Sequence, residues 1–195
     1  MEDSIWTGTV ASLRGRIAGP DPVPAGVSAA AVTATFALGL LCKVLTICAR
    51  RNKFTGDRNL LHTILEAARA ESTILERAAD QDIAAFQLYM ESRALHRAGS
   101  IDATIDVPMD AVRAAARGLH LCVPAVDLVH PFVAPDLGAA ASLLAGAIRA
   151  MLLSIRYNTR QLASGEPPAE LQQLEERALE QAEIVRRRVL ELIGQ

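Results

Sequence analysis

A single carboxylate stands among apolar residues that recur at helical spacing in the middle of the chain. The apolar side chains fall on one face of the predicted helix, and Asp82 lies at the centre of that face. This face consists of Leu75, Ala79, Asp82, Phe86 and Met90, with Ile83 beside it. Burial among apolar side chains disfavours an ionised carboxylate and raises its pKa.

A raised pKa is what a carboxyl group needs to act as a general acid or base near neutral pH. Asp82 is therefore a candidate for proton transfer. The alternative is a structural role, in which Asp82 pairs with an arginine or caps a kinked helix. Asp80 falls on a different face of the same helix and is predicted to be solvated.

Two further polar residues occupy apolar faces. Lys43 shares a face with Phe36 and Ile47, and Asn158 continues the face of Ile155. Each could contribute to a binding site. Lys43 could equally extend to a helix end or a subunit surface, and Asn158 could bond to the backbone of another helix.

The common catalytic and metal-binding motifs are absent from the sequence. It has no P-loop, no dinucleotide-binding glycine motif, no HExxH and no nucleophile elbow, and its 4 histidines lack the spacing of metal ligands. We therefore predict no metal site and no resident cofactor. The net charge of −2 also gives no reason to expect a nucleic-acid partner.

The cysteines and the first residues bear on the cellular compartment. The 3 cysteines form no CxxC pair, and Cys42 and Cys48 lie in an apolar segment. Free thiols in a reducing compartment are the simplest interpretation. The first ten residues carry acids where an export signal would carry bases. These features predict a cytoplasmic protein.

The composition favours helices as the elements that position these residues. Hydrophobic residues make up 51% of the 195 residues but aromatic residues only 4%, which suits closely packed helices better than a β-sandwich. Prolines and glycines divide the chain, and Asp57 and Asp136 are candidate N-caps. We predict an all-α antiparallel bundle of about six helices in a single domain, residues 1–195. The predicted helices span residues 4–17, 26–51, 57–96, 108–128 and 136–162, with a final amphipathic helix after residue 168.

The second predicted helix is apolar enough to require a comparison with membrane spans. Val27–Ala49 contains one charged residue, Lys43, and is long enough to cross a bilayer. However, this segment is rich in small residues and runs directly into a basic stretch, Arg50–Lys53. A central helix that is buried on all sides has the same composition. We therefore predict no membrane span.

Several short segments resemble the cyclodeaminase/cyclohydrolase family of one-carbon folate enzymes. The run Pro22–Ala31 is similar to the proline- and glycine-rich turn that leads into an apolar helix in that family. Ala79–Phe86 resembles its Asp-x-x-Ala-Phe/Tyr motif, with Asp82 at the acidic position. Similar matches occur at Leu45–Phe54, at Pro135–Gly138 and at Ile155–Asn158. Their order and spacing agree over about residues 5–165.

The resemblance implies an all-helical protein that is usually a homodimer. Members of the family close formiminotetrahydrofolate to the methenyl form with loss of ammonia, or open the methenyl form with water. Both reactions pass through a tetrahedral carbon and move a proton, and the resemblance assigns that proton transfer to Asp82. It also implies that Arg50, Arg51 and Lys53 bind the glutamate carboxylates of the folate. The remaining substrate-binding positions that it implies are Pro24, Ala25, Gly26, Val27, Ser28, Phe132, Asp136 and Asn158.

The sequence departs from the family pattern at positions that face the folate. Side chains stand at Ala25 and Val27 where the family has bare glycine backbone. His130 and Phe132 fall in the segment where the family carries two amide side chains. His130 is thereby a second candidate acid or base.

Three functions remain open from the sequence. The first is a folate cyclodeaminase or cyclohydrolase that binds a tetrahydrofolate derivative as its substrate. The second is an enzyme of the same fold that cyclises, hydrolyses or eliminates on a different small molecule. The third is a non-catalytic bundle used for dimerisation or for partner binding.

Overall fold

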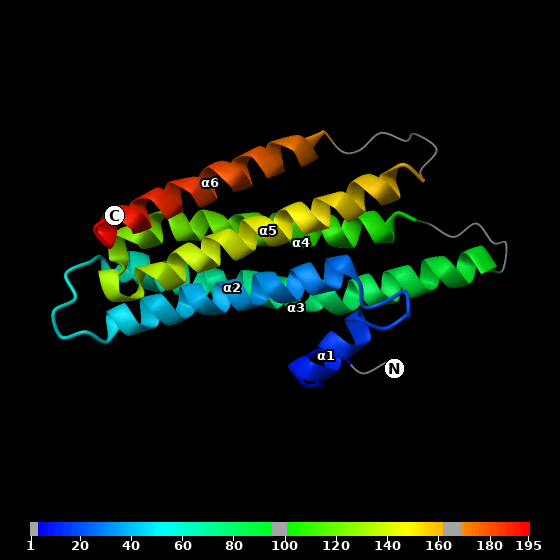
Figure 1. Ribbon diagram of the computed structural model, residues 1–195, viewed down its shortest axis with the longest axis horizontal. Coiled ribbons are helices and arrows are strands. Elements are labelled where there is room, and N and C mark those ends of the chain that lie inside the picture. Colours follow the sequence, from blue (N-terminus) through cyan, green and yellow to red (C-terminus); the bar gives the residue numbers. More distant parts are fainter. Residues whose placement is uncertain (1–3, 95–100, 162–168) are drawn as a thin grey trace.

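The structure is a computed structural model, and it describes residues 4–94, 101–161 and 169–195. Every regular element in these ranges is helical, which confirms the all-α prediction. The helices run antiparallel to their neighbours in sequence along an elongated bundle (Figure 1). They are α1 (Val10–Ile17), α2 (Gly26–Ala49), α3 (Arg58–Ala94), α4 (Ala103–Ala125), α5 (Ala134–Thr159) and α6 (Glu170–Leu192), with short 3-10 turns at Val126–Leu128 and Pro131–Val133.

Four long helices form the centre of the bundle. Helix α2 packs against α3 and α5, α4 packs against the same two helices, and α6 covers α4 and α5. Small side chains allow close approach at several points in the core. A Cβ atom at Gly118 of α4 would lie 2.7 Å from Leu38 Cδ2 of α2, so this crossing requires glycine unless Leu38 moves.

The helix boundaries agree in part with the predictions. Asp57 caps α3 as predicted, because its Oδ1 accepts hydrogen bonds from the amides of Asn59 and Leu60. Helix α4 begins five residues earlier than predicted, at Ala103, and contains Pro108. Pro108 is the sixth residue of α4 and has no amide to donate to the Thr104 carbonyl. Asn158 Nδ2 donates to that carbonyl instead, at 2.9 Å.

The expected cap at Asp136 is wrong. Helix α5 begins at Ala134, and Asp136 lies within its first turn. Its carboxylate instead accepts a hydrogen bond of 2.7 Å from Lys43 Nζ of α2. Lys43 is exposed and reaches a helix end, which was one of the two interpretations of this residue.

The N-terminal segment differs from the predicted helix over residues 4–17. Only Val10–Ile17 is helical, and the preceding residues lie against α3. Ser4 Oγ and the amide of Ile5 donate to the two oxygens of Asp80, at 2.6 and 3.0 Å. The expectation that Asp80 is solvated is therefore wrong. An irregular segment has no periodicity, so its place against this face of α3 could not be predicted from the sequence.

Helices α2 and α5 present apolar side chains on both sides. The segments Gly26–Ala49 and Pro131–Thr159 are each long and apolar enough to cross a membrane, but half of each is buried inside the bundle, as in core helices. Exposed and partly exposed apolar side chains also recur at helical spacing along these two neighbouring helices, and we call them the outward face. Its larger residues are Phe36, Leu40, Ile47, Leu143, Leu153 and Tyr157.

Candidate functional site

A cavity of about 330 Å³ lies at the N-terminal end of α2, with Asp82 in its wall. Three elements build it: the Pro22–Val27 turn, the second half of α3, and the last turns of α5. The turn contributes Ala25, Gly26 and Val27, and α5 contributes Asn158. The structure thus brings together five residues that the sequence had singled out separately, Asp82 among them. The cavity volume is within the range of small-molecule sites.

Asp82 is almost fully removed from solvent, with 9% of its surface exposed. Ser28 Oγ donates a hydrogen bond of 2.8 Å to Asp82 Oδ2. Burial raises the pKa of the Asp82 carboxyl, and hydrogen bonds from the hydroxyl and backbone amide of Ser28 partly oppose that rise. Asp82 forms no ion pair with any residue that the structure describes. The interpretation in which Asp82 pairs with an arginine is therefore not supported among the residues that the structure describes.

The start of α2 explains why a carboxylate is held at this place. The first amides of a helix have no partner within the helix, and the N-cap residue Ala25 has no side-chain acceptor for them. Ser28 lies in this first turn, and Asp82 approaches it from α3. The positive end of the helix dipole favours a negative charge here. Asp82 therefore serves the α2 terminus and also faces the cavity.

Aromatic and amide side chains complete the cavity wall. Asn158 Nδ2 donates to the backbone carbonyl of Thr104 at 2.9 Å, which is the structural one of the two alternatives for this residue, and this bond fixes the amide beside the cavity. Phe86 of α3 and Tyr157 of α5 present aromatic rings to the same space. Our site prediction omitted both, although they belong to the segments that resemble the family. A flat conjugated ligand would find stacking partners here.

A second group of predicted residues lies at the opposite end of α2. Arg51, Lys53 and His130 line a small cavity of about 130 Å³. Helix α2 has 24 residues, so about 36 Å separates its two ends. Within one chain, the structure therefore separates Asp82 from the predicted basic stretch.

Comparison with known proteins identifies the family of the chain. A sequence model described as formiminotransferase-cyclodeaminase matches residues 9–178. The chain belongs to the formiminotransferase-cyclodeaminase family. The resemblance read from the short motifs is thereby confirmed, while no curated protein matches the sequence.

A solved structure shares the fold of this family member. The crystal structure of formiminotetrahydrofolate cyclodeaminase from Thermotoga maritima superposes with a TM-score of 0.82. The match covers 97% of each chain at 17% sequence identity. At this identity the likeness concerns the fold, and residue roles must come from the geometry of this chain.

The remaining predicted residues of this formiminotransferase-cyclodeaminase family member fall into two groups. Ser28 is fully buried and contacts Asp82, whereas Pro24 is buried and is not one of the residues that line the cavity. Arg50, Phe132 and Asp136 lie near the C-terminal end of α2. Phe132 is highly exposed, with 84% of its surface accessible.

His130 does not adjoin the Asp82 cavity in this chain. Its Nδ1 accepts a hydrogen bond of 3.2 Å from the amide of Phe132, and its own amide donates to Cys48 Sγ at 3.3 Å. The expectation that it lies beside Asp82 is not met within one protomer. The order of the motifs along the sequence does not give the distance between His130 and Asp82. That distance is large because α2 is a single helix of 24 residues and the two side chains lie near its opposite ends.

Proposed function

We propose that this protein is a one-carbon folate enzyme that closes formiminotetrahydrofolate to the methenyl form with loss of ammonia. The observation that carries the proposal is the buried Asp82 carboxyl, which lacks a cationic partner among the described residues and lines a cavity with two aromatic walls. Membership of the family supports the substrate class. Hydrolysis of the methenyl form is the alternative direction of the same chemistry.

The proposed role of Asp82 follows from its protonation. A carboxyl with a raised pKa is protonated more often near neutral pH than an exposed aspartate. As a carboxylate it takes the proton that the attacking nitrogen loses, and as an acid it gives a proton to the departing ammonia. In the hydrolytic direction the attacking group is water. Proton transfer by one positioned group contributes about 10²–10⁴-fold to a rate.

The rings of Phe86 and Tyr157 suit the flat pterin system, and the Asn158 amide suits its polar edge. We place the reacting end of the folate in this cavity. The glutamate carboxylates need cations, but Arg51 and Lys53 of the same chain lie near the other end of α2. A folate with one glutamate is shorter than that helix, so one chain does not supply both halves of the site.

A homodimer resolves this separation. The outward face runs along α2 and α5, and its larger side chains are apolar; Phe36 is 52% exposed and Leu153 is 66% exposed. We propose that two chains pair through it about a two-fold axis perpendicular to α2. Such an axis places the basic end of the partner beside the Asp82 cavity, because Leu153 and Tyr157 belong to both the cavity wall and the outward face.

The other expectations accompany this proposal. We expect a cytoplasmic protein that binds a small-molecule substrate and needs no resident cofactor, and we expect neither nucleic acid nor a membrane as its partner. Its cysteines are free in the structure, in keeping with a reducing compartment. Burial raises the pKa of the Cys122 thiol to about 12, so that thiol is not a nucleophile.

The experiment that tests the function follows the absorbance of the methenyl chromophore. The purified protein is incubated with formiminotetrahydrofolate, and separately with methenyltetrahydrofolate. We expect the chromophore to appear in the first case; its accelerated loss in the second would instead assign hydrolysis. If folded protein neither binds nor converts either compound, the folate proposal fails. The side chains of Ala25 and Val27, which line the cavity, would then favour an enzyme for another small molecule.

A further inference from the structure

A second and larger cavity lies between α3, α4 and α6. Its volume is about 610 Å³, and it shares no lining residue with the Asp82 cavity. Helix α4 forms the floor, and α3 and α6 form the two walls. The family chemistry described above makes no use of this space. Its volume alone would suit a small organic molecule.

Apolar side chains line part of the α4 floor and part of the α6 wall of this cavity. Ala116 and Leu121 line it from α4, and Leu174 lines it from α6. All three side chains are only partly buried and contact the main hydrophobic core. Covering them with an apolar ligand would remove this surface from water, which favours binding.

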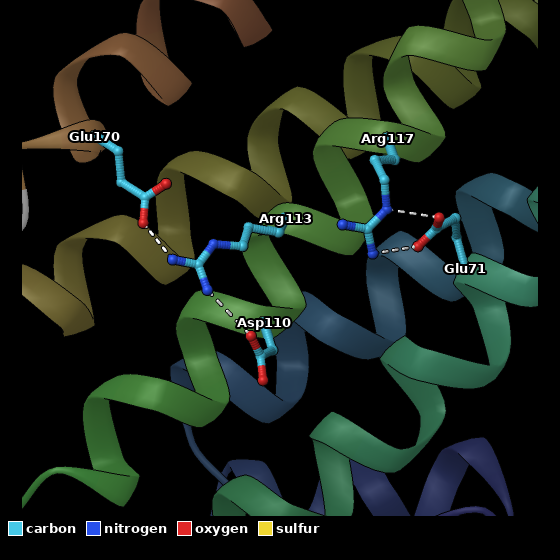
Figure 2. Close-up of polar contacts among 5 residues, drawn as sticks. All are labelled: Glu71, Asp110, Arg113, Arg117 and Glu170. Carbon is cyan, nitrogen blue, oxygen red and sulfur yellow. Dashed lines mark hydrogen bonds and ion pairs between the residues drawn. The ribbon is translucent and has the colours of Figure 1, made fainter.

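The rim of the cavity is cationic and is held in place by ion pairs. Arg117 donates from Nε and Nη2 to the two carboxylate oxygens of Glu71, at 2.7 and 2.8 Å (Figure 2). Arg113 bonds to Asp110 at 3.2 Å and to Glu170 of α6. A guanidinium group has five N–H donors, so each arginine keeps donors that these partners do not use. The ion pairs thus hold the guanidinium groups of Arg113 and Arg117 in place and leave some of their N–H donors available to a ligand.

A third arginine on the rim lacks a carboxylate partner among the described residues. Arg177 of α6 lines the cavity and forms no ion pair with the residues that the structure describes. Three guanidinium groups therefore line the cavity against a single carboxylate, that of Glu71. Asp110 and Glu170 lie outside the lining and both pair with Arg113, so these three carboxylates balance the three arginines in number, and Arg177 is the cation left unpaired among them. The arrangement complements a ligand that joins an anionic head to an apolar body.

We infer that this cavity binds an amphipathic organic anion, namely an apolar carboxylate, phosphate or sulfonate. The apolar body lies on the Ala116–Leu121 floor, and the anionic head lies among the arginines, with Arg177 as the cation free to pair with it. This site is independent of the proposed folate chemistry, because the two cavities have no residue in common.

The test uses anilinonaphthalene sulfonate, an amphipathic anion whose fluorescence rises in an apolar site. The full chain is titrated with the dye, and decanoate and decylamine are then compared as competitors. Two variants probe the site: Arg177→Gln removes the free cation, and Ala116→Phe fills the floor. Arg187→Gln is the control, since it removes a charge of the same kind from α6 at an exposed position outside the cavity.

We expect Arg177→Gln to weaken dye binding by about three- to tenfold, the range of one hydrogen bond at a solvent-exposed position. Ala116→Phe should abolish the high-affinity phase, and Arg187→Gln should leave it unchanged. Decanoate should displace the dye, and decylamine should not. Equal binding by wild type and Arg177→Gln, or displacement by decylamine as readily as by decanoate, would overturn the inference. The Arg177→Gln result decides the matter even if Ala116→Phe does not fold, because Arg177 is a surface residue.

Discussion

Ser28 Oγ donates a hydrogen bond of 2.8 Å to Asp82 Oδ2, and this bond joins the first turn of α2 to the middle of α3. Ser28 is fully buried, and Asp82 is 9% exposed. The contact connects the turn over residues 22–27 to the proposed acid/base group. The hydrogen bond also lowers the pKa of Asp82 and so opposes part of the rise that burial causes.

Removal of the Ser28 hydroxyl should therefore alter both stability and pH dependence. We expect Ser28→Ala to raise the Asp82 pKa further and to shift the corresponding limb of the pH–rate profile to higher pH. An ionised carboxylate left without this donor should cost about 1–3 kcal/mol of stability at neutral pH. Urea unfolding and a pH–rate profile measure the two effects.

Ser72→Ala is the matched control for that variant. Its hydroxyl also donates to a carboxylate, that of Glu76 at 3.2 Å, but in a partly exposed place on α3. This change should alter stability little, because water replaces the lost bond. If the two variants behave alike, the Ser28–Asp82 bond has no special part in the site.

The raised pKa of Asp82 should make the stability of the protein depend on pH. Its folded pKa is raised, so the native state binds more protons than the unfolded state between the two pKa values. This favourable contribution is complete below the unfolded pKa and is lost as the pH rises through the folded pKa. Asp82→Asn does not titrate, so its stability relative to wild type should increase as the pH rises from the unfolded pKa, about 4, through the raised folded pKa.

Urea unfolding of wild type and Asp82→Asn across that range measures the difference directly. Asp80→Asn is a useful comparison, since Asp80 accepts hydrogen bonds from Ser4 and Ile5 instead of lying in the cavity. If the free energy of unfolding of wild type instead rose relative to that of Asp82→Asn as the pH increased, the assigned direction of the pKa shift would be contradicted.

The proposed dimer can be tested at its outward face. Phe36→Glu places a charge in the middle of α2 on the exposed apolar surface, and an unpaired charge buried at an interface opposes association. Sedimentation at micromolar concentration should show a dimer for wild type and a 20.8 kDa chain for the variant. Activity should fall with dissociation, because the proposed site needs the partner.

Leu179→Glu is the control for charge alone, as Leu179 is an exposed leucine on α6 and lies outside the outward face. It should sediment as wild type does. A wild-type protein that remains monomeric, yet turns over folate at the same specific rate at all concentrations, would refute the shared site.

The sequence predicted the helical fold because apolar periodicity and proline breaks are local signals. Asp57, for example, could be assigned as a cap from its position before an apolar run, and the structure confirms it. Asp80 and Asp136 were assigned wrongly, because their partners Ser4 and Lys43 come from segments far away in the chain. Contacts between distant segments leave no trace in periodicity.

The same reasoning explains what was found and missed in the site. Asp82 could be singled out because a carboxylate interrupts an apolar face, which is visible in the sequence. Phe86 and Tyr157 lie in two of the segments that resemble the family, but apolar periodicity does not distinguish an aromatic residue of a site from one of the core. His130 was placed beside Asp82 by motif resemblance, but the length of α2 puts it at the other end of the bundle.

The central claim is that Asp82 moves the proton during folate cyclisation, and Asp82→Asn tests it most directly. The substitution keeps the size and the Ser28 contact while it removes the titratable group, and no ion pair is broken among the described residues. The measurement is the specific rate of methenyl formation from formiminotetrahydrofolate, taken together with the melting temperature. We expect the rate to fall by about 10²–10⁴-fold with the melting temperature maintained. An unchanged specific rate in the folded variant would contradict the claim.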